Sequence, residues 1–174
     1  SSASWNDCVF LGTKMPLALF EDSQMNNVVF NKCSLTDSKW SHVYGMTLQL
    51  AHADMSASQI RNCNLSHATM LHMTATNAQW RDSDFLNSDL NQVNFTSSQL
   101  ENLVLRSCSL EQAQFTRASL TKCDLKDALC MDSNLSGAHF DACELNAADF
   151  SRALQHGEPA EFRNCAMEQM FLAG

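Results

Sequence analysis

The sequence lacks the short motifs that mark most catalytic and cofactor sites. It contains no Gly-rich phosphate loop, no Gly-Xaa-Ser-Xaa-Gly nucleophile turn, no His-Glu-Xaa-Xaa-His zinc motif, no paired-carboxylate motif and no Cys-Xaa-Xaa-Cys pair. Nucleophilic, phosphate-transfer and zinc chemistry all require such groupings at fixed spacing. These absences predict a protein that is not an enzyme and that holds no cofactor.

Long hydrophobic runs are also missing. No stretch approaches the roughly 20 apolar residues that a membrane-spanning helix needs, and no basic segment followed by an apolar one opens the chain. With 174 residues and 45% apolar content, the chain can form one domain with a continuous core. Its first residue is Ser rather than Met, so we expect a piece of a longer protein.

A five-residue repeat is present along most of the chain. From Trp5 to Phe150 every fifth position is large and apolar in 27 of 30 cases, and the position two residues earlier is Ala, Ser, Cys, Thr or Val in 27 of 30. Neither a helical period of about 3.6 residues nor a strand period of 2 produces both regularities. The pattern predicts stacked repeats, a solenoid, with the large and the small position both pointing inward.

The repeat is clearest in SerAspPheLeuAsn at 83–87, CysAspLeuLysAsp at 123–127 and AlaAspPheSerArg at 148–152. These units resemble the pentapeptide repeat family, whose pattern is Ala-Asp/Asn-Leu-X-X. The resemblance implies an all-β fold, a right-handed quadrilateral β-helix of about eight coils with four pentapeptides in each coil. Residues 20 apart would then stack, about 4.8 Å from one another.

Departures from the repeat compensate one another in volume. The large position shrinks to Ala75 where the neighbouring small position holds Met73, and it shrinks to Gly45 where the next small position holds Leu48. A close-packed interior demands such exchanges, because both voids and excess volume cost stability. The sequence therefore predicts that these pairs lie in one packed core.

The beat breaks near the C-terminus. HisGlyGluPro at 156–159 interrupts the five-residue repeat. The large apolar position then returns two residues late, at Phe162 and Met167. We therefore divide the chain into a β-helix at 1–153, a projecting loop at 154–160, and a last partial coil with a cap at 161–174.

The eight cysteines and six histidines predict neither a disulfide framework nor a metal site. Seven cysteines occupy the small inward position and Cys130 the large one, where a thiol behaves as a small hydrophobe. His52 and His72 share one column, but no third ligand converges on them. We expect a reducing environment, and hence a cytoplasmic protein.

Charge is divided unevenly along the chain. Residues 1–81 hold five acidic and five basic residues, whereas residues 82–174 hold fourteen acidic and six basic ones, so the whole formal charge of −8 lies in the second half. This balance disfavours direct nucleic-acid binding through a basic face. The outward acids form two candidate interaction columns: Asp84, Asp124 and Glu144, and Asp89 with Asp149.

Two neutral or basic columns lie among the outward positions. Gln59, Gln79 and Gln99 are spaced by one coil, and we expect an amide ladder. Arg61 and Arg81 form a second column that Glu101 ends.

Both ends carry clusters of apolar residues. In the first coil Val9, Leu11, Pro16, Leu17 and Leu19 occupy positions that should face outward, and the tail contains the apolar residues Met170, Phe171 and Leu172. The ends of a solenoid expose core and need capping. We expect these residues to form end caps or interfaces, including a homodimer through one end.

The favoured function is a non-catalytic scaffold that binds a protein partner, as one module of a larger bacterial protein. The resemblance also implies an association with secretion systems, or delivery into another cell as an effector. The alternative comes from the family's quinolone-resistance and topoisomerase-inhibitor branch, which implies an acidic mimic of DNA that binds DNA gyrase. Fold resemblance alone does not choose between these functions.

Overall fold

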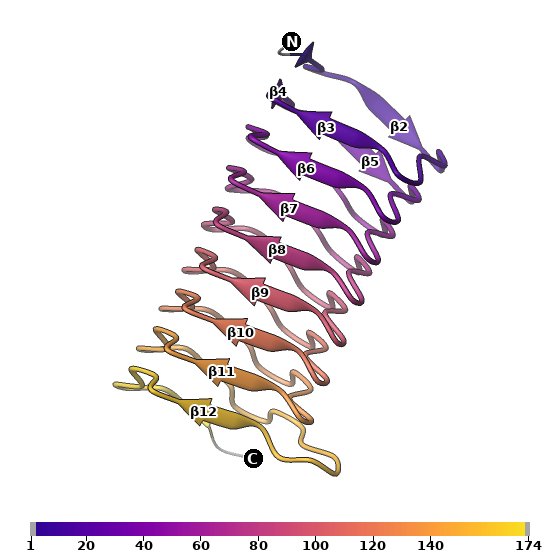
Figure 1. Ribbon diagram of the computed structural model, residues 1–174. Coiled ribbons are helices and arrows are strands. Elements are labelled where there is room, and N and C mark those ends of the chain that lie inside the picture. The colour runs from indigo at the N-terminus through magenta and orange to yellow at the C-terminus, as the bar shows by residue number, and fades with distance from the viewer. Residues whose placement is uncertain (1–2, 173–174) are drawn as a thin grey trace.

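The computed structural model describes residues 3–172 and shows a rod of short parallel strands wound around one axis (Figure 1). The two termini lie at opposite ends of the rod. The strands are β1 (Ala3–Ser4), β2 (Val9–Leu11), β3 (Leu19–Glu21), β4 (Ser23–Gln24), β5 (Val29–Asn31), β6 (Lys39–Ser41), β7 (Gln59–Arg61), β8 (Gln79–Arg81), β9 (Gln99–Glu101), β10 (Ser119–Thr121), β11 (His139–Asp141) and β12 (Glu161–Arg163). The predicted all-β solenoid of about eight coils is confirmed.

Coils stack with residues 20 apart in register, as the repeat predicts. Gln59 pairs with Gln79, and Gln79 pairs with Gln99. Pairing occurs at four points in each coil, which gives the rod four outer faces, each named here by its first column of outward residues. Face 1 begins Ser4, Gln24, Tyr44; face 2 begins Val9, Val29, Gln49; face 3 begins Lys14, Ser34, Asp54; face 4 begins Leu19, Lys39, Gln59.

Each inner coil donates backbone hydrogen bonds to the coil on each side. The Val29 N–H bonds to the Cys8 carbonyl of the preceding coil at 2.9 Å, and the Phe30 N–H bonds to the Gln49 carbonyl of the following coil at 2.7 Å. The chain turns between faces at residues with φ between 47° and 63°, from Asp7 to Arg152. Asn, Asp and His tolerate this left-handed conformation better than other non-glycine residues, so their frequency at the corners has a backbone cause.

The core is one continuous column of side chains from the large and small positions. All large positions from Phe20 to Phe150 are buried. Phe10 and Phe30 stack with ring centroids 4.9 Å apart, and Phe140 and Phe162 stack at 4.8 Å. Aromatic pairs of this kind stabilise the core by more than the burial of their apolar area alone.

Volume exchange within the core is confirmed at Gly45. A Cβ atom placed there would lie 3.2 Å from a Leu65 methyl and 3.4 Å from the Leu48 Cβ, so the neighbouring leucines fill the space that Gly45 leaves. Met73 and Ala75 are both fully buried. Leu48 and Met73 thus lie at small positions beside the two shortest large positions, Gly45 and Ala75.

Indole groups in the core find buried serine partners. Trp40 donates its N–H to the Ser38 hydroxyl at 2.9 Å, and Trp80 donates to Ser58 in the preceding coil at 3.0 Å. The indole N–H of Trp5, in the first coil, has no partner among the described residues. A buried donor that lacks an acceptor is unusual and costly, and it lies at the open end of the rod.

The register changes after Leu154, the last residue that pairs 20 positions along. Phe140 pairs with Phe162 and Glu144 with Ala166, so the intervening segment contains two extra residues. These extra residues lie in a loop that includes Gly157, whose φ is 88°. Residues 1–2 of the predicted first unit and 173–174 of the predicted last unit lie outside the described residues.

Candidate functional site

The five candidate acids lie on faces 1 and 2, in the second half of the rod. Asp84, Asp124 and Glu144 share the outward column of face 1, with Val104 between the first two. Asp89 and Asp149 share the outward column of face 2, where Ser109 and Leu129 separate them. Each column is thus acidic but interrupted.

Four of these acids also hold the backbone. The carboxylates of Asp84, Asp89, Asp124 and Asp149 each accept a hydrogen bond from the N–H two residues later, at 2.8–3.1 Å. This local bond satisfies a backbone donor beside the corner, as Asp and Asn commonly do in turns. Asp124 has a further partner, because the Arg106 guanidinium lies 2.6 Å from its other oxygen.

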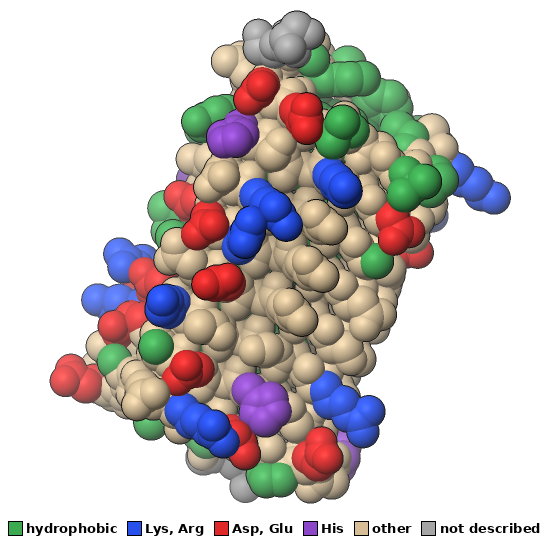
Figure 2. All heavy atoms as spheres, in the orientation of Figure 1, with side chains coloured by type: hydrophobic (Ala, Val, Ile, Leu, Met, Phe, Trp, Pro, Cys, Tyr) green, Lys and Arg blue, Asp and Glu red, His purple; other side chains and the backbone are tan. Residues whose placement is uncertain are grey.

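The apolar residues of the first coil form a patch on the outside of the rod. We call this set, Val9, Leu11, Pro16, Leu17 and Leu19, the apolar patch. The four aliphatic side chains are 59–75% exposed, and Leu17 is the most exposed. Figure 2 shows apolar side chains gathered beside the N-terminal end, at the upper right. Monomeric proteins seldom leave such clusters in water, so this surface is a candidate contact site.

Leu17 is also conformationally unfavourable where it lies. Its φ of 60° places it at a left-handed corner, which Asn, Asp or Gly would occupy at lower cost. The residue thus carries both a backbone penalty and an exposed apolar side chain.

At the C-terminal end the tail gives a second, smaller apolar surface. Phe171 is 61% exposed and Leu172 45%, whereas Met170 is half-buried against the core. Leu154 and Met167, also exposed, extend this surface, and Leu154 was not among the sequence candidates. Its outward position and the register break beside it are the signals that identify it.

Face 4 holds the glutamine and arginine columns, and the expected amide ladder is not formed there. Gln59, Gln79 and Gln99 stack in register, but none of their side-chain amides makes a hydrogen bond among the described residues. Register fixes the spacing of the three Cα atoms, while the flexible side chains leave the amides turned to solvent. Arg61 and Arg81 lie next to this column and are in register with each other.

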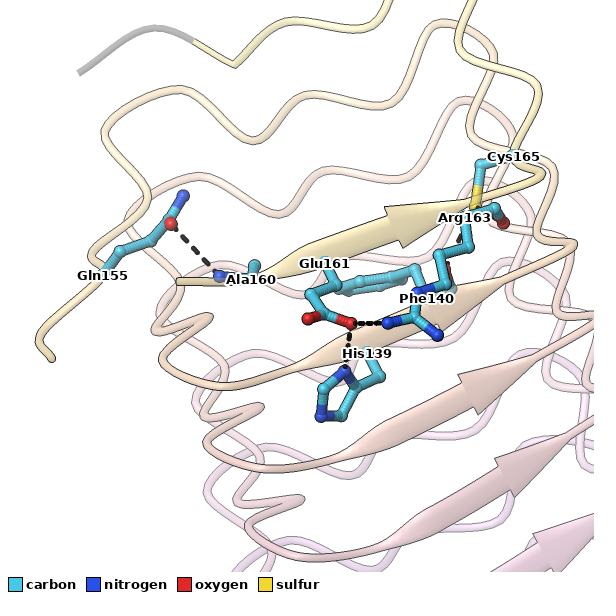
Figure 3. A network of polar contacts seen from close by, with 7 residues as sticks. All are labelled: His139, Phe140, Gln155, Ala160, Glu161, Arg163 and Cys165. Carbon is cyan, nitrogen blue, oxygen red and sulfur yellow. Dashed lines mark hydrogen bonds and ion pairs between the residues drawn. The ribbon is translucent and has the colours of Figure 1, made fainter. Parts of the chain in front are cut away.

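Farther along face 4, a polar network follows the loop (Figure 3). Glu161 accepts from the Arg163 guanidinium at 2.8 Å and lies 3.2 Å from His139 Nδ1. The network borders an open depression of about 480 Å³. The sequence analysis did not single out this network, although the two-residue delay of the repeat at Phe162 is the signal that places Glu161 opposite His139.

Ser119, His139 and Glu161 follow one another on face 4 in the order of a nucleophilic triad. The geometry of a triad is nevertheless incomplete. No hydrogen bond joins Ser119 to His139 among the described residues, and the backbone N–H groups of the inner coils are bonded to neighbouring coils. Nucleophilic catalysis needs both a base on the hydroxyl and free donors for the oxyanion. Among the described residues, Ser119, His139 and Glu161 therefore do not form a nucleophilic triad.

The thiols are free, and most are buried. Burial raises the pKa of Cys108 to about 12, which leaves it protonated and unreactive at neutral pH. The Cys123 thiol lowers the pKa of Cys143 by hydrogen bonding to it in the next coil. Cys165, at the end of the same column, is only partly buried.

The predicted histidine column exists but stays a surface feature. His52 and His72 occupy left-handed corners, and their rings stack with centroids 4.8 Å apart. Within residues 3–172, no three His, Cys, Asp or Glu side chains converge to hold a metal ion. Across those same residues there is also no apolar helix of membrane-spanning length.

A four-faced parallel solenoid with a five-residue inward pattern defines the class of pentapeptide-repeat β-helices. The family model described as pentapeptide repeats (8 copies) matches residues 98–129. The chain thus contains a segment that matches the pentapeptide-repeat model, within a rod that has the fold of pentapeptide-repeat proteins. Among curated proteins, no sequence matches it.

Solved structures share the fold at low sequence identity. HetL, a pentapeptide repeat protein involved in heterocyst differentiation regulation from the cyanobacterium Nostoc sp. strain PCC 7120, is 16% identical with a TM-score of 0.51, and the match covers 97% of this chain and 86% of HetL. QnrB1, a plasmid-mediated fluoroquinolone resistance protein, is 16% identical with a TM-score of 0.52, over 95% of this chain and 93% of QnrB1. At such identity the likeness concerns the fold.

Proposed function

We propose that this protein is a non-catalytic scaffold that binds another protein through the apolar patch of its first coil, as a module of a larger bacterial protein in the cytoplasm. The conformation and exposure of Leu17 are the observations that carry the proposal. Leu17 keeps a 75% exposed side chain at a left-handed corner with φ of 60°, so it is unfavourable in the isolated rod on two counts. A partner surface that buries it would offset both.

The patch is suited to a protein partner because it lies on a rigid part of the rod. The patch lies on the first coil, whose backbone is hydrogen-bonded to the second coil. Binding therefore requires little ordering of the scaffold. The partner is either an adjoining domain or a second copy that forms a dimer through this end.

Leu17→Asn combined with Leu19→Lys should remove the contact and leave the rod folded. Asn relieves the left-handed corner, and neither leucine is buried, so we expect a free energy of unfolding within about 1 kcal/mol of the wild type. The wild type should bind an apolar dye such as anilinonaphthalene sulfonate, or increase in mass with concentration in light scattering. The variant should do neither.

Leu129→Gln is the matched control, because it removes an exposed leucine from face 2 outside the patch. It should leave dye binding and mass unchanged. A wild type that stays monomeric and binds no dye would contradict the proposal.

A second candidate function is an acidic mimic of DNA that binds DNA gyrase. The specific observation in its favour is the placement of Asp84, Asp124 and Glu144 on one face, in a chain that shares its fold with a fluoroquinolone resistance protein. Phosphates of duplex DNA also present negative charge along a line.

A gyrase supercoiling assay with the purified protein tests this candidate. Asp84→Asn, Asp124→Asn and Glu144→Gln together remove three charges, while each Asn still accepts the backbone hydrogen bond that its Asp accepts. We expect wild-type inhibition, or protection from a quinolone, to disappear in the triple variant and to persist in Glu111→Gln. Absence of any wild-type effect would reject the DNA-mimic function.

A further inference from the structure

Face 4 carries a pair of arginines that the fold places side by side without a partner. Arg61 and Arg81 are in register on β7 and β8, so their Cα atoms are about 4.8 Å apart. Neither guanidinium forms an ion pair or a side-chain hydrogen bond within residues 3–172. Like charges directly opposite on neighbouring strands destabilise a sheet.

The surroundings favour an anion. On one side of the pair, the same two strands present Gln59 and Gln79, whose amides are unbonded and can donate. Lys39 precedes Gln59 in that column, so the strands of β6 to β8 contain three cations and no acid. Figure 2, which looks onto this face, shows Lys and Arg side chains close together in its upper half. This local charge contrasts with the net charge of −8 for the chain.

We propose that Arg61 and Arg81 together bind one phosphate group, with the amides of Gln59 and Gln79 as additional donors. Two guanidinium groups at this spacing can each direct N–H donors at a single tetrahedral anion. The bound anion would also cancel the repulsion between the two arginines. The phosphate is either free in solution or the phosphorylated side chain of a partner protein, because the flat face admits both.

The acids nearest this pair define its limits. Glu101 follows Arg81 in the same column, and Asp82 follows it in the chain, where its carboxylate accepts a bond from Asn102 at 2.9 Å. Both disfavour a long polyanion along the axis, while one phosphate group between Arg61 and Arg81 is accommodated. The site lies apart from the apolar patch and does not depend on its function.

Titration with inorganic phosphate, followed by calorimetry at constant ionic strength, is the first test. Two charge-assisted interactions on an exposed face should give saturable binding with a dissociation constant on the order of 1 mM. Arg61→Gln and Arg81→Gln should each weaken it about tenfold or more. Arg117→Gln is the matched control on another part of the surface and should bind as the wild type does. Equal weakening by Arg117→Gln, or no saturable binding by the wild type, would overturn the proposal.

Two further measurements separate a binding site from a structural role. Without phosphate, Arg81→Gln should raise the melting temperature by about 1 to 3 °C, because the repulsion is gone. A fall would mean that the arginine pair stabilises the fold, against the proposal. Glu101→Gln should tighten phosphate binding, since it removes the competing charge beside Arg81; unchanged binding would count against the site.

A phosphoserine peptide and its unphosphorylated form distinguish the two sources of phosphate. Tighter binding of the phosphopeptide than of inorganic phosphate, lost in Arg61→Gln, supports a partner protein. Equal binding of the two supports the free anion. Binding of a single-stranded oligonucleotide that phosphate does not compete would overturn the assignment in favour of a polyanion surface.

Discussion

Leu105→Asp should unfold the rod. Leu105 is 1% exposed and lies in the middle coils, where the core surrounds it on every side. A carboxylate buried there without a partner costs several kcal/mol, which is comparable to the whole stability of a typical domain. Phe115 lies two pentapeptides after Leu105 and is fully buried, so Phe115→Asp should have the same effect. Circular dichroism and chemical denaturation measure the loss.

Gln79→Ala is the control for this prediction. Its side chain is exposed and makes no hydrogen bond among the described residues, so its loss should change the free energy of unfolding by no more than about 1 kcal/mol. Similar effects for Leu105→Asp and Gln79→Ala would mean that the assigned register is wrong.

Trp80→Ala should cost about 3–5 kcal/mol, the usual range for truncating a large buried aromatic residue. Trp80 is 1% exposed, stacks on Phe85 at 5.2 Å and meets Phe95 edge-on, also at 5.2 Å. Truncation also leaves the buried Ser58 hydroxyl without its indole donor. Urea denaturation, with a lower midpoint and an unchanged slope, would show the effect.

Trp5→Ala provides the comparison at the end of the rod. Trp5 is only half-buried and its N–H has no partner, so less packing and no hydrogen bond are lost. We expect a clearly smaller cost than for Trp80→Ala. An equal cost at both positions would contradict a solenoid in which each coil depends on its immediate neighbours.

The five-residue period predicts the fold well because burial itself dictates it. Leu105 and Phe115 are inward by period, and the structure buries both. The same reasoning places Gln59 over Gln79 and Arg61 over Arg81, because stacking by 20 residues follows from four units per coil. Regular packing is thus readable from the chain alone.

Side-chain contacts on the surface are less predictable, for a physical reason. The amides of Gln59 and Gln79 have several rotamers in water, so register does not fix their hydrogen bonds. The two-residue delay of the repeat places Glu161 beside His139, but the contact between their side chains also depends on rotamers that the repeat does not specify.

The left-handed corners bear on what the acidity of this protein means. Six corner positions are aspartates: Asp7, Asp22, Asp37, Asp82, Asp127 and Asp132. Five further aspartates, Asp54, Asp84, Asp89, Asp124 and Asp149, accept a backbone N–H two residues on. Much of the low isoelectric point is therefore a by-product of backbone geometry, and selection for a turn can imitate selection for a charged partner. In such rods, replacing Asp with Asn keeps the side-chain oxygen that accepts the backbone hydrogen bond and removes the charge. This exchange therefore distinguishes a role in the turn from a role in binding a charged partner.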